Sequence, residues 1–323
     1  MDNKDYVNID FHDCDMQELK AYDEGLRFVF PEWMHRVNAA EGGESYLIVG
    51  SEKTALWDCG MCYQGEGLVR NIRAVLGERP LDYVLLSHTH YDHLGALPYV
   101  RKAYPCVITF GAAYGQKVLT RPSALEVMER LGNAAATSFY DADEVSPVIT
   151  EGLAIDRAVG DGDVIDLGDR KIRVLTTPGH TDCSLSFAIE PERLLLTSES
   201  TGVYHGDDMV DPAILKSFDD AMISLAKCRA YGANQLASCH FGLLPPGYTE
   251  RYFDRFEYFA RRERYMIKQW LRDGRTPDEV LDLMVEAYRE QSQGQQVEDA
   301  FVENACWTIR MYRKEVEKEE NDQ

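Results

Sequence analysis

The sequence predicts an α/β fold followed by a helical C-terminal extension. Up to about residue 245, short apolar segments ended by Gly, Pro or Asp alternate with segments of helical spacing, which is typical of strands and helices in mixed order. From residue 248 onward the pattern is wholly helical. A chain of 323 residues is long enough for one large domain with an appendage. We therefore expect a mixed domain over residues 1–247 and a helical extension over residues 248–323.

The mixed part should begin with a hairpin, because two apolar runs flank the turn sequence GSEK. The long helical stretch over residues 113–140 breaks at Arg121-Pro122, with Ser123 as a candidate cap, and its second half is either a lid or a packing helix. The expected strands are 46–49, 54–57, 83–87, 107–110, 164–167, 172–176, 184–189, 194–197 and 235–238, and the expected helices are 68–76, 95–103, 113–140, 218–231, 249–273, 277–291 and 296–318.

The composition restricts the partners. Lys and Arg total 34 against 55 Asp and Glu, which gives a net charge of -21. Such a surface repels phosphate backbones and anionic lipid, so we expect a small-molecule substrate, with neither nucleic acid nor a membrane as partner. The sequence shows no apolar run long enough for a membrane span and no apolar segment of a signal peptide, so we expect a cytoplasmic protein. A homodimer through the C-terminal helices is compatible with the sequence, although no motif indicates it.

Eight cysteines are scattered through the chain, which favours reduced thiols over a disulfide framework. Cys59 and Cys62 form a C-x-x-C pair that could be redox-active or bind zinc. No second pair of this kind follows, and the setting expected of a thioredoxin is missing. The pattern therefore favours a structural or incidental pair.

The stretch SHTHYDHLG, residues 87–95, follows an apolar run and holds His88, His90, Asp92 and His93. A turn that leaves a buried strand can aim such side chains into one small volume. Neutral imidazole and carboxylate suit Zn, Fe, Mn or Co. The alternative is a solvated polar loop, but three of the chain's 8 histidines fall within this short stretch. The cluster therefore predicts a metal site.

Three further metal-binding side chains stand at the ends of later strands. His180 follows a predicted strand in TTPGHTDCS, and His240 follows another in LASCHFG. Glu199 ends a third strand in LLLTSES. A carboxylate at the end of a buried strand is costly unless something pairs with it, and a metal ion is such a partner.

The order H-x-H-x-D-H, P-G-H-T, acidic strand end and late His, over residues 40 to 245, resembles the metallo-β-lactamase superfamily. The resemblance implies an αββα sandwich, two sheets faced by helices, with two divalent metal ions, either Zn or Fe, with Mn as a third option. The bridging acid of the superfamily is normally Asp, and the extra methylene of Glu199 changes the geometry of that bridge. By this resemblance His88, His90 and His180 would hold the first metal, Asp92, His93 and His240 the second, and Glu199 both.

Three more residues receive roles from their positions. Asp58 matches an acidic position of the superfamily, and the resemblance implies that it would accept a hydrogen bond from the histidine loop and fix ring orientation. The alternative is an ordinary Asp that ends a strand and caps a turn. Tyr204 and His205 stand a few residues beyond Glu199, where they could reach the substrate.

The predicted function is metal-dependent hydrolysis, in which a metal-bound hydroxide attacks an ester or thioester. Asp92 would serve both as a ligand and as a proton acceptor. HYDHLGALPYV, PSALEVMERL and the C-terminal helices resemble the quinolone-signal response thioesterase branch, which implies that the extension covers the site. The alternatives are a lactonase, a glyoxalase-II-like thioesterase and, from a different class, a ligand-binding regulatory protein with a metal pocket and little turnover.

Overall fold

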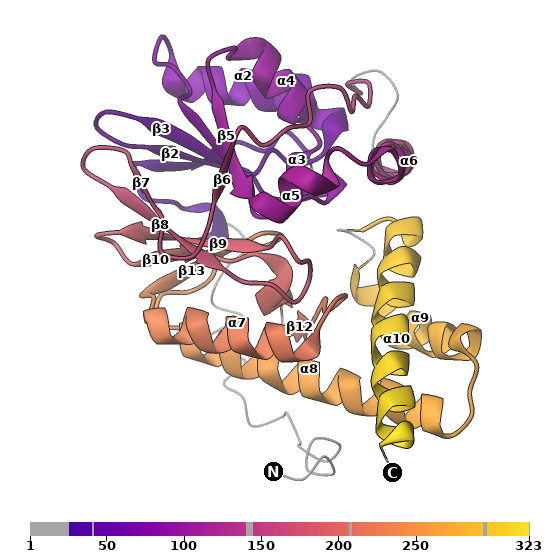
Figure 1. The fold of residues 1–323 in the computed structure, drawn as a ribbon. Coiled ribbons are helices and arrows are strands. Elements are labelled where there is room, and N and C mark those ends of the chain that lie inside the picture. Colours follow the sequence, from indigo (N-terminus) through magenta and orange to yellow (C-terminus); the bar gives the residue numbers. More distant parts are fainter. Residues whose placement is uncertain (1–25, 41, 140–144, 207–208, 293–295, 323) are drawn as a thin grey trace.

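A computed structural model describes residues 26–40, 42–139, 145–206, 209–292 and 296–322. Two six-stranded sheets lie face to face, and helices cover the outer face of each (Figure 1). The predicted αββα sandwich is therefore confirmed. No helix in these ranges combines the length and the apolar character needed to cross a membrane.

The first sheet has the strand order β1-β2-β3-β4-β5-β6. Its first three strands are antiparallel, whereas β3 to β6 are parallel. Because parallel neighbours end at the same edge of a sheet, the loops that follow β3, β4 and β5 emerge together. The strands are β1 (Met34–Arg36), β2 (Tyr46–Val49), β3 (Thr54–Trp57), β4 (Tyr83–Leu85), β5 (Ile108–Ala112) and β6 (Arg157–Val159).

The second sheet has the order β14-β13-β10-β9-β8-β7, in which only β10 and β13 are parallel neighbours. A separate two-stranded sheet pairs β11 with β12. The strands are β7 (Val164–Asp166), β8 (Lys171–Thr176), β9 (Leu185–Glu190), β10 (Leu194–Leu196), β11 (Val203–Gly206), β12 (Met209–Asp211), β13 (Gln235–Ser238) and β14 (Gly242–Leu243).

Helices α2 and α4 cover the first sheet, and α7 and α8 cover the second (Figure 1). Helix α10 contacts α8 and α9 and also reaches α6, so it stands beside the open end of the sandwich (Figure 1). The α-helices are α2 (Gly65–Leu76), α3 (Tyr91–Leu94), α4 (Leu97–Ala103), α5 (Ala113–Val118), α6 (Pro122–Phe139), α7 (Phe218–Tyr231), α8 (Thr249–Arg272), α9 (Pro277–Ser292) and α10 (Glu298–Asn321).

Alternation along the strands divides the core into layers. In β2, Tyr46 and Ile48 pack between the two sheets, while Leu47 packs with the helices outside the first sheet. In β9, Phe187 packs between the sheets and Ala188 packs with the helices outside the second. Successive side chains of a strand point to opposite faces, so both faces of each sheet are buried at these strands.

The structure differs from the sequence prediction in its short elements. The stretch 113–140 is two helices, and Pro122 opens the second, so that Ser123 lies inside α6 instead of capping it. The one-turn helix α3 precedes the predicted helix near residues 95–103. The sequence did not predict strands β1, β6, β11, β12 and β14, each of which has only two to four residues.

Candidate metal centre

The histidine loop places four polar side chains at the carboxyl edge of the first sheet. After β4 the chain runs through His88 and His90 into α3, which carries Asp92 and His93. The backbone of α3 passes close to an earlier loop: a Cβ on Gly43 would lie 2.1 Å from the carbonyl oxygen of Asp92. Only glycine leaves room for this approach, so Gly43, which the sequence did not single out, helps to set the position of α3.

Three more side chains reach the same place from the second sheet. His180 lies between β8 and β9, Glu199 begins the 3-10 helix η5 (Glu199–Thr201) after β10, and His240 follows β13. All three side chains are buried. The structure therefore brings together all seven side chains assigned to metal ions by the resemblance, in two groups that share Glu199.

The first group consists of His88, His90, His180 and Glu199, whose nearest ligand atoms all lie within 4.8 Å of one another. Oε2 of Glu199 is 2.5 Å from Nε2 of His180 and 3.3 Å from Nε2 of His88. Nδ1 of His90 is 2.9 Å from Nε2 of His180. Three ring nitrogens and one carboxylate oxygen thus surround a single small volume.

The second group consists of Asp92, His93, His240 and Glu199. Oδ2 of Asp92 is 3.4 Å from Nε2 of His240 and 3.5 Å from Nε2 of His93. Oε1 of Glu199 is 3.0 Å from Nε2 of His240. This group therefore holds two carboxylates, where the first group holds one.

The carboxylate of Glu199 lies between the two groups. Its Oε2 faces the first group and its Oε1 faces His240 of the second. Burial raises the pKa of Glu199, but His180, His240 and His88 outweigh this effect and hold it well below its usual value. The extra methylene, which the sequence marked as a departure from the superfamily pattern, thus leaves the carboxylate in the shared position.

One set of hydrogen bonds orients the rings from the side of the first sheet. Oδ2 of Asp58 is 2.9 Å from Nδ1 of His93, and it also accepts a hydrogen bond of 2.6 Å from the hydroxyl of Ser87. Because that hydroxyl donates to Asp58, it accepts from Nδ1 of His88 at 3.0 Å. Both rings therefore turn Nε2 toward the centre, and in the neutral form of each ring this nitrogen carries no proton.

A second set of contacts orients His180 from the side of the helices. Nδ1 of His180 donates to the carbonyl oxygen of Ala213 at 2.6 Å. The NH group of Ala213 in turn donates to Oδ1 of Asp211 at 3.0 Å. Thr308 of α10 donates to the carbonyl oxygen of Ile214 at 3.0 Å, so the C-terminal helix is tied to the same loop. The sequence indicated none of these contacts.

Unpaired buried nitrogens show that the two groups suit metal ions. Nε2 of His88 and Nε2 of His93 are both buried and have no hydrogen-bond partner among the described residues. Buried polar atoms are nearly always paired, so these two need an explanation. An imidazole nitrogen and a carboxylate oxygen are both ordinary ligands of a divalent transition metal. The two groups sharing Glu199 therefore suggest a dinuclear metal site.

Comparison with known proteins agrees with this geometry. The sequence profile described as "Metallo-beta-lactamase superfamily" matches residues 40–227. The chain belongs to the metallo-beta-lactamase superfamily. A Burkholderia pseudomallei protein described as a probable metallo-hydrolase is 29% identical over 180 residues, which cover 52% of this chain and 55% of that protein. The chain thus spans about half the length of that relative.

Two further likenesses concern the fold. A metallo-beta-lactamase fold-containing protein of Sulfurisphaera tokodaii is 25% identical over 211 residues, which cover 64% of this chain and 76% of that one. The crystal structure of a metallo-beta-lactamase family protein from Thermus thermophilus superposes with a TM-score of 0.57 at 19% identity, over 89% of this chain and 95% of that one. Such a likeness shows that the metallo-beta-lactamase fold is shared.

The histidines of this metallo-beta-lactamase site differ in their protonation. Burial, aided by the nearby His93, lowers the pKa of His88 well below its usual value. Burial also lowers the pKa of His93, but the charges of Asp92 and Asp58 outweigh it and raise that pKa to about 10. A metal binds the neutral ring, so His93 has to give up a proton when a metal binds there.

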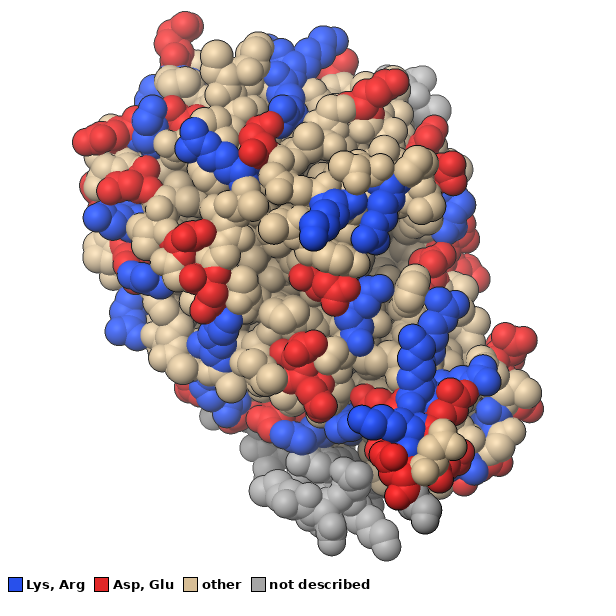
Figure 2. Space-filling model, viewed as in Figure 1, with Lys and Arg blue, Asp and Glu red and all other residues tan. Residues whose placement is uncertain are grey.

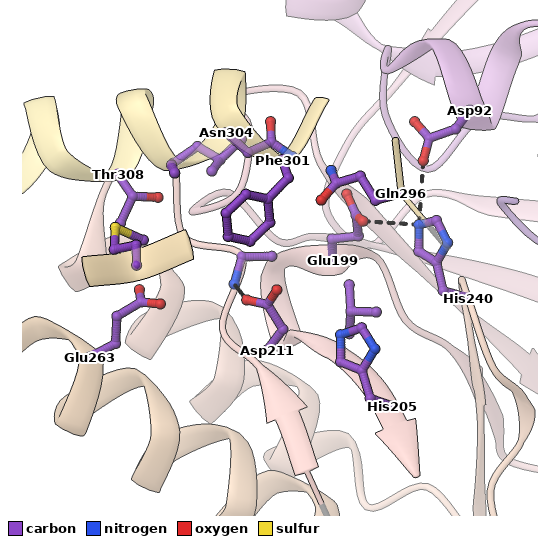
Figure 3. Close-up of a pocket in the computed structure, with 15 residues that line it drawn as sticks. Asp92, Glu199, His205, Asp211, His240, Glu263, Gln296, Phe301, Asn304 and Thr308 are labelled. Carbon is purple, nitrogen blue, oxygen red and sulfur yellow. Dashed lines mark hydrogen bonds and ion pairs between the residues drawn. The ribbon is translucent and has the colours of Figure 1, made fainter. Parts of the chain in front are cut away.

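Two cavities meet at the centre, and Asp92 and Glu199 line both. The wide cavity, of about 470 Å³, extends between α5, α6 and α10. The narrow cavity, of about 60 Å³, extends toward α8 and α9 (Figure 3). The wide cavity is lined by Tyr114, Val118, Arg121, Met128, Leu131, Lys216 and Trp307, among others, and the narrow one by His205, Asp211, Glu263, Met284, Phe301 and Thr308, among others.

The two residues proposed from sequence as substrate contacts point in different directions. His205 lines the narrow cavity. Tyr204 is buried against Phe241, Tyr248 and Tyr252 and lines neither cavity. Neighbours on strand β11 face opposite sides, so only one of the two can reach the centre. A substrate contact is therefore not supported for Tyr204.

The thiols of the C-x-x-C pair do not belong to either metal group, although the NH group of Cys59 donates to the carbonyl oxygen of His93 at 2.6 Å. Cys59 and Cys62 are both buried, and burial raises the pKa of the Cys62 thiol to about 11. Its sulfur accepts a hydrogen bond from the NH group of Ile149 and donates to the carbonyl oxygen of Pro147. A thiol with such a pKa is a poor nucleophile, in agreement with a structural role.

Proposed function

We propose that the protein is a metal-dependent hydrolase of esters or thioesters. The observation that carries this proposal is the Glu199 carboxylate shared by two groups of ligand atoms at the junction of two cavities. A structural metal site is normally closed by protein ligands, whereas a catalytic site keeps room for substrate beside the metal. The two cavities supply that room.

The residues around the metal centre have different roles in the proposed hydrolysis. Divalent ions bound there would lower the pKa of a water molecule and polarise the substrate carbonyl. Asp58 and Ser87 hold two of the rings in the tautomer that exposes Nε2. The carboxylate of Asp92 faces both cavities and can accept the proton of the attacking water and pass it to the leaving group.

The wide cavity favours a substrate with an apolar acyl portion. Val118, Met128, Leu131 and Trp307 give it apolar walls. Its size falls within the range of about 300–1,000 Å³ that is common for small-molecule sites. Charged side chains of both signs are interspersed on the face of the molecule in Figure 2, and no continuous basic surface for nucleic acid is visible there.

The test is turnover by full-length protein loaded with zinc or iron, against a panel of thioesters, esters, a lactone and a glutathione thioester. We expect hydrolysis of an apolar ester or thioester. Asp92→Asn should lower kcat by about 10²–10⁴-fold. Asp166→Asn is the matched control, because the Asp166 side chain is 59% exposed and lies on β7, outside both cavities.

Two outcomes would contradict the proposal. Metal-loaded protein that binds members of the panel but turns over none of them would be a ligand-binding regulatory protein. Equal rates in wild type and Asp92→Asn, at equal metal content, would show that Asp92 does not transfer the proton. Preference for the lactone or the glutathione thioester would instead identify the branch of acyl hydrolase.

A further inference from the structure

The end of the narrow cavity away from the metal centre is built mainly by the C-terminal helices. Glu263 comes from α8, Met284 from α9, and Phe301 and Thr308 from α10. Asp211, at the end of β12, completes this end of the cavity (Figure 3). None of these residues belongs to the two metal groups. Their side chains therefore bear first on what occupies the cavity, although Asp211 and Thr308 also contact the loop that orients His180.

Glu263 is the unexplained residue in this cavity. Its side chain is buried, with the residue only 4% exposed, and Oε1 has no hydrogen-bond partner among the described residues. A buried carboxyl oxygen without a partner is unfavourable, and a bound ligand with a hydrogen-bond donor would supply the missing partner. In Figure 3 the carboxyl group of Glu263 lies beside the cavity, below Thr308.

The charge around Glu263 is negative. Asp211 faces the same cavity, and no Lys or Arg is among the described residues that line it. Burial, followed by the charge of Asp211, raises the pKa of Glu263 well above its usual value. The environment therefore favours the protonated carboxyl group when the cavity holds only water, and a positive charge beside it would favour the ionised form.

We propose that the narrow cavity binds a primary ammonium group of the substrate, with Oε1 of Glu263 as its hydrogen-bond acceptor. This inference rests on the hydrolase function proposed above and names its substrate class, an ester or thioester that carries an amine. An ammonium group offers three donors and no acceptor, which matches an unpaired acceptor in an acidic cavity. Phe301 and Met284 supply apolar walls for the alkyl chain beside it.

The size of the narrow cavity limits the group that it can hold. One water molecule needs roughly 10–15 Å³ on the same measure. A volume of about 60 Å³ therefore accommodates about four to six non-hydrogen atoms, which is the size of a short aminoalkyl group. The bulkier apolar portion of the substrate belongs in the wide cavity.

The binding test uses zinc-loaded, full-length protein and propylamine, with propanol as a neutral probe of similar size. We expect calorimetry to show that propylammonium binds with release of a proton, because Glu263 ionises on binding. Glu263→Gln should bind about tenfold more weakly and release no proton. Glu250→Gln on the same helix is the control, since the Glu250 side chain is 62% exposed and should behave as wild type.

The turnover test compares thioesters of short ω-amino acids with thioesters of alkanoic acids of the same length. Wild type should prefer the amino substrate by about tenfold in kcat/KM, and Glu263→Gln should hydrolyse the amino and alkanoic substrates with nearly equal kcat/KM.

The possible results distinguish a failure of the proposed ammonium subsite from a failure of the proposed hydrolase function. If propanol binds as well as propylammonium, Glu263 acts as a neutral donor and the ammonium assignment is overturned. If Glu263→Gln leaves propylammonium affinity and the amine preference intact, the subsite is overturned while the hydrolase function stands. If no thioester is hydrolysed, the proposed function fails, and calorimetry alone decides the subsite.

Discussion

The two sides of the metal centre are built on different principles. On the sheet side, Asp58, Ser87 and the rings of His88 and His93 form a buried network in which each hydrogen bond fixes the next. On the helix side, Oε1 of Glu263 has no hydrogen-bond partner within the part of the chain that the structure describes. The sheet side thus orients ligand atoms before a metal binds. The helix side instead leaves a hydrogen-bond acceptor available for a substrate that binds and dissociates.

Backbone strain appears on both sides, at the residues that orient the rings. Asp58 and Ala213 are among the non-glycine residues with positive φ, at 53° and 49°. Such conformations persist where the surrounding structure imposes them, commonly at functional sites. Aspartate tolerates this region better than alanine, so the strain is larger at Ala213, on the helix side.

The largest effect is expected from Glu199→Ala, which removes the group that both sides share. The second group should lose its metal first, because two cations without a common carboxylate repel each other and this group keeps only Asp92, His93 and His240. The first group keeps the three imidazoles of His88, His90 and His180, a set of ligands that can hold a catalytic zinc without a carboxylate. Glu199→Asp should retain both ions. Counting bound zinc per chain during titration checks this, and unchanged occupancy in Glu199→Ala would exclude Glu199 as a ligand.

Asp58→Asn tests whether the sheet side is as important as its network suggests. The amide keeps the shape but not the charge, so it supports the Nε2-exposing tautomer of His93 less well. We expect metal affinity to fall by about 10–100-fold. Competition with a chelator of known affinity measures the change, with Asp166→Asn as the exposed control. A metal affinity equal to that of wild type would show that Asp58 does not orient the metal ligands and only ends a strand.

Glu263→Gln should stabilise the metal-free protein in a pH-dependent manner. The folded pKa of Glu263 is raised, so above its usual value of 4.5 the unfolded chain loses a proton that the folded chain keeps. Wild-type stability therefore falls as the pH rises from there toward the folded pKa. The variant escapes this loss and should gain about 1–3 kcal/mol at pH 8. Denaturant unfolding at pH 5 and pH 8 measures it, and a pH-independent difference would refute the explanation.

Thr308→Val should have the smallest effect. It removes the buried hydrogen bond from α10 to the carbonyl oxygen of Ile214 and should cost about 1 kcal/mol of unfolding free energy. Thr137→Val is the matched control, because Thr137 makes a similar bond to a backbone carbonyl on the exposed face of α6. An equal loss in both variants would mean that the tie between α10 and the loop adds no stability of its own.

The sheet side could be predicted largely from the sequence, and the helix side could not. His88, His90, Asp92 and His93 share a nine-residue stretch, so one strand end places them all. His180 and His240 also follow strands, and the edge of a sheet gathers such positions whatever the details of packing.

Glu263 shows why the helix side escaped prediction. In the sequence it stands among arginines on an amphipathic helix, like many solvated glutamates. Its burial depends on how α8 lies against β12 and α10, which are distant in the chain. Gly43, Ser87 and Asp211 belong to the same class, because each acts through one contact that only the folded chain creates.

The loop over residues 211–214 connects helix α10 to the metal-binding residue His180. Thr308 holds Ile214, and the adjacent Ala213 holds the ring of His180. A molecule in the narrow cavity would contact α10, which lines the cavity and anchors this loop. Substrate affinity and metal affinity should therefore depend on each other, and thermodynamic reciprocity requires the same factor in both directions. An apo protein would then bind substrate poorly even where the substrate touches no metal.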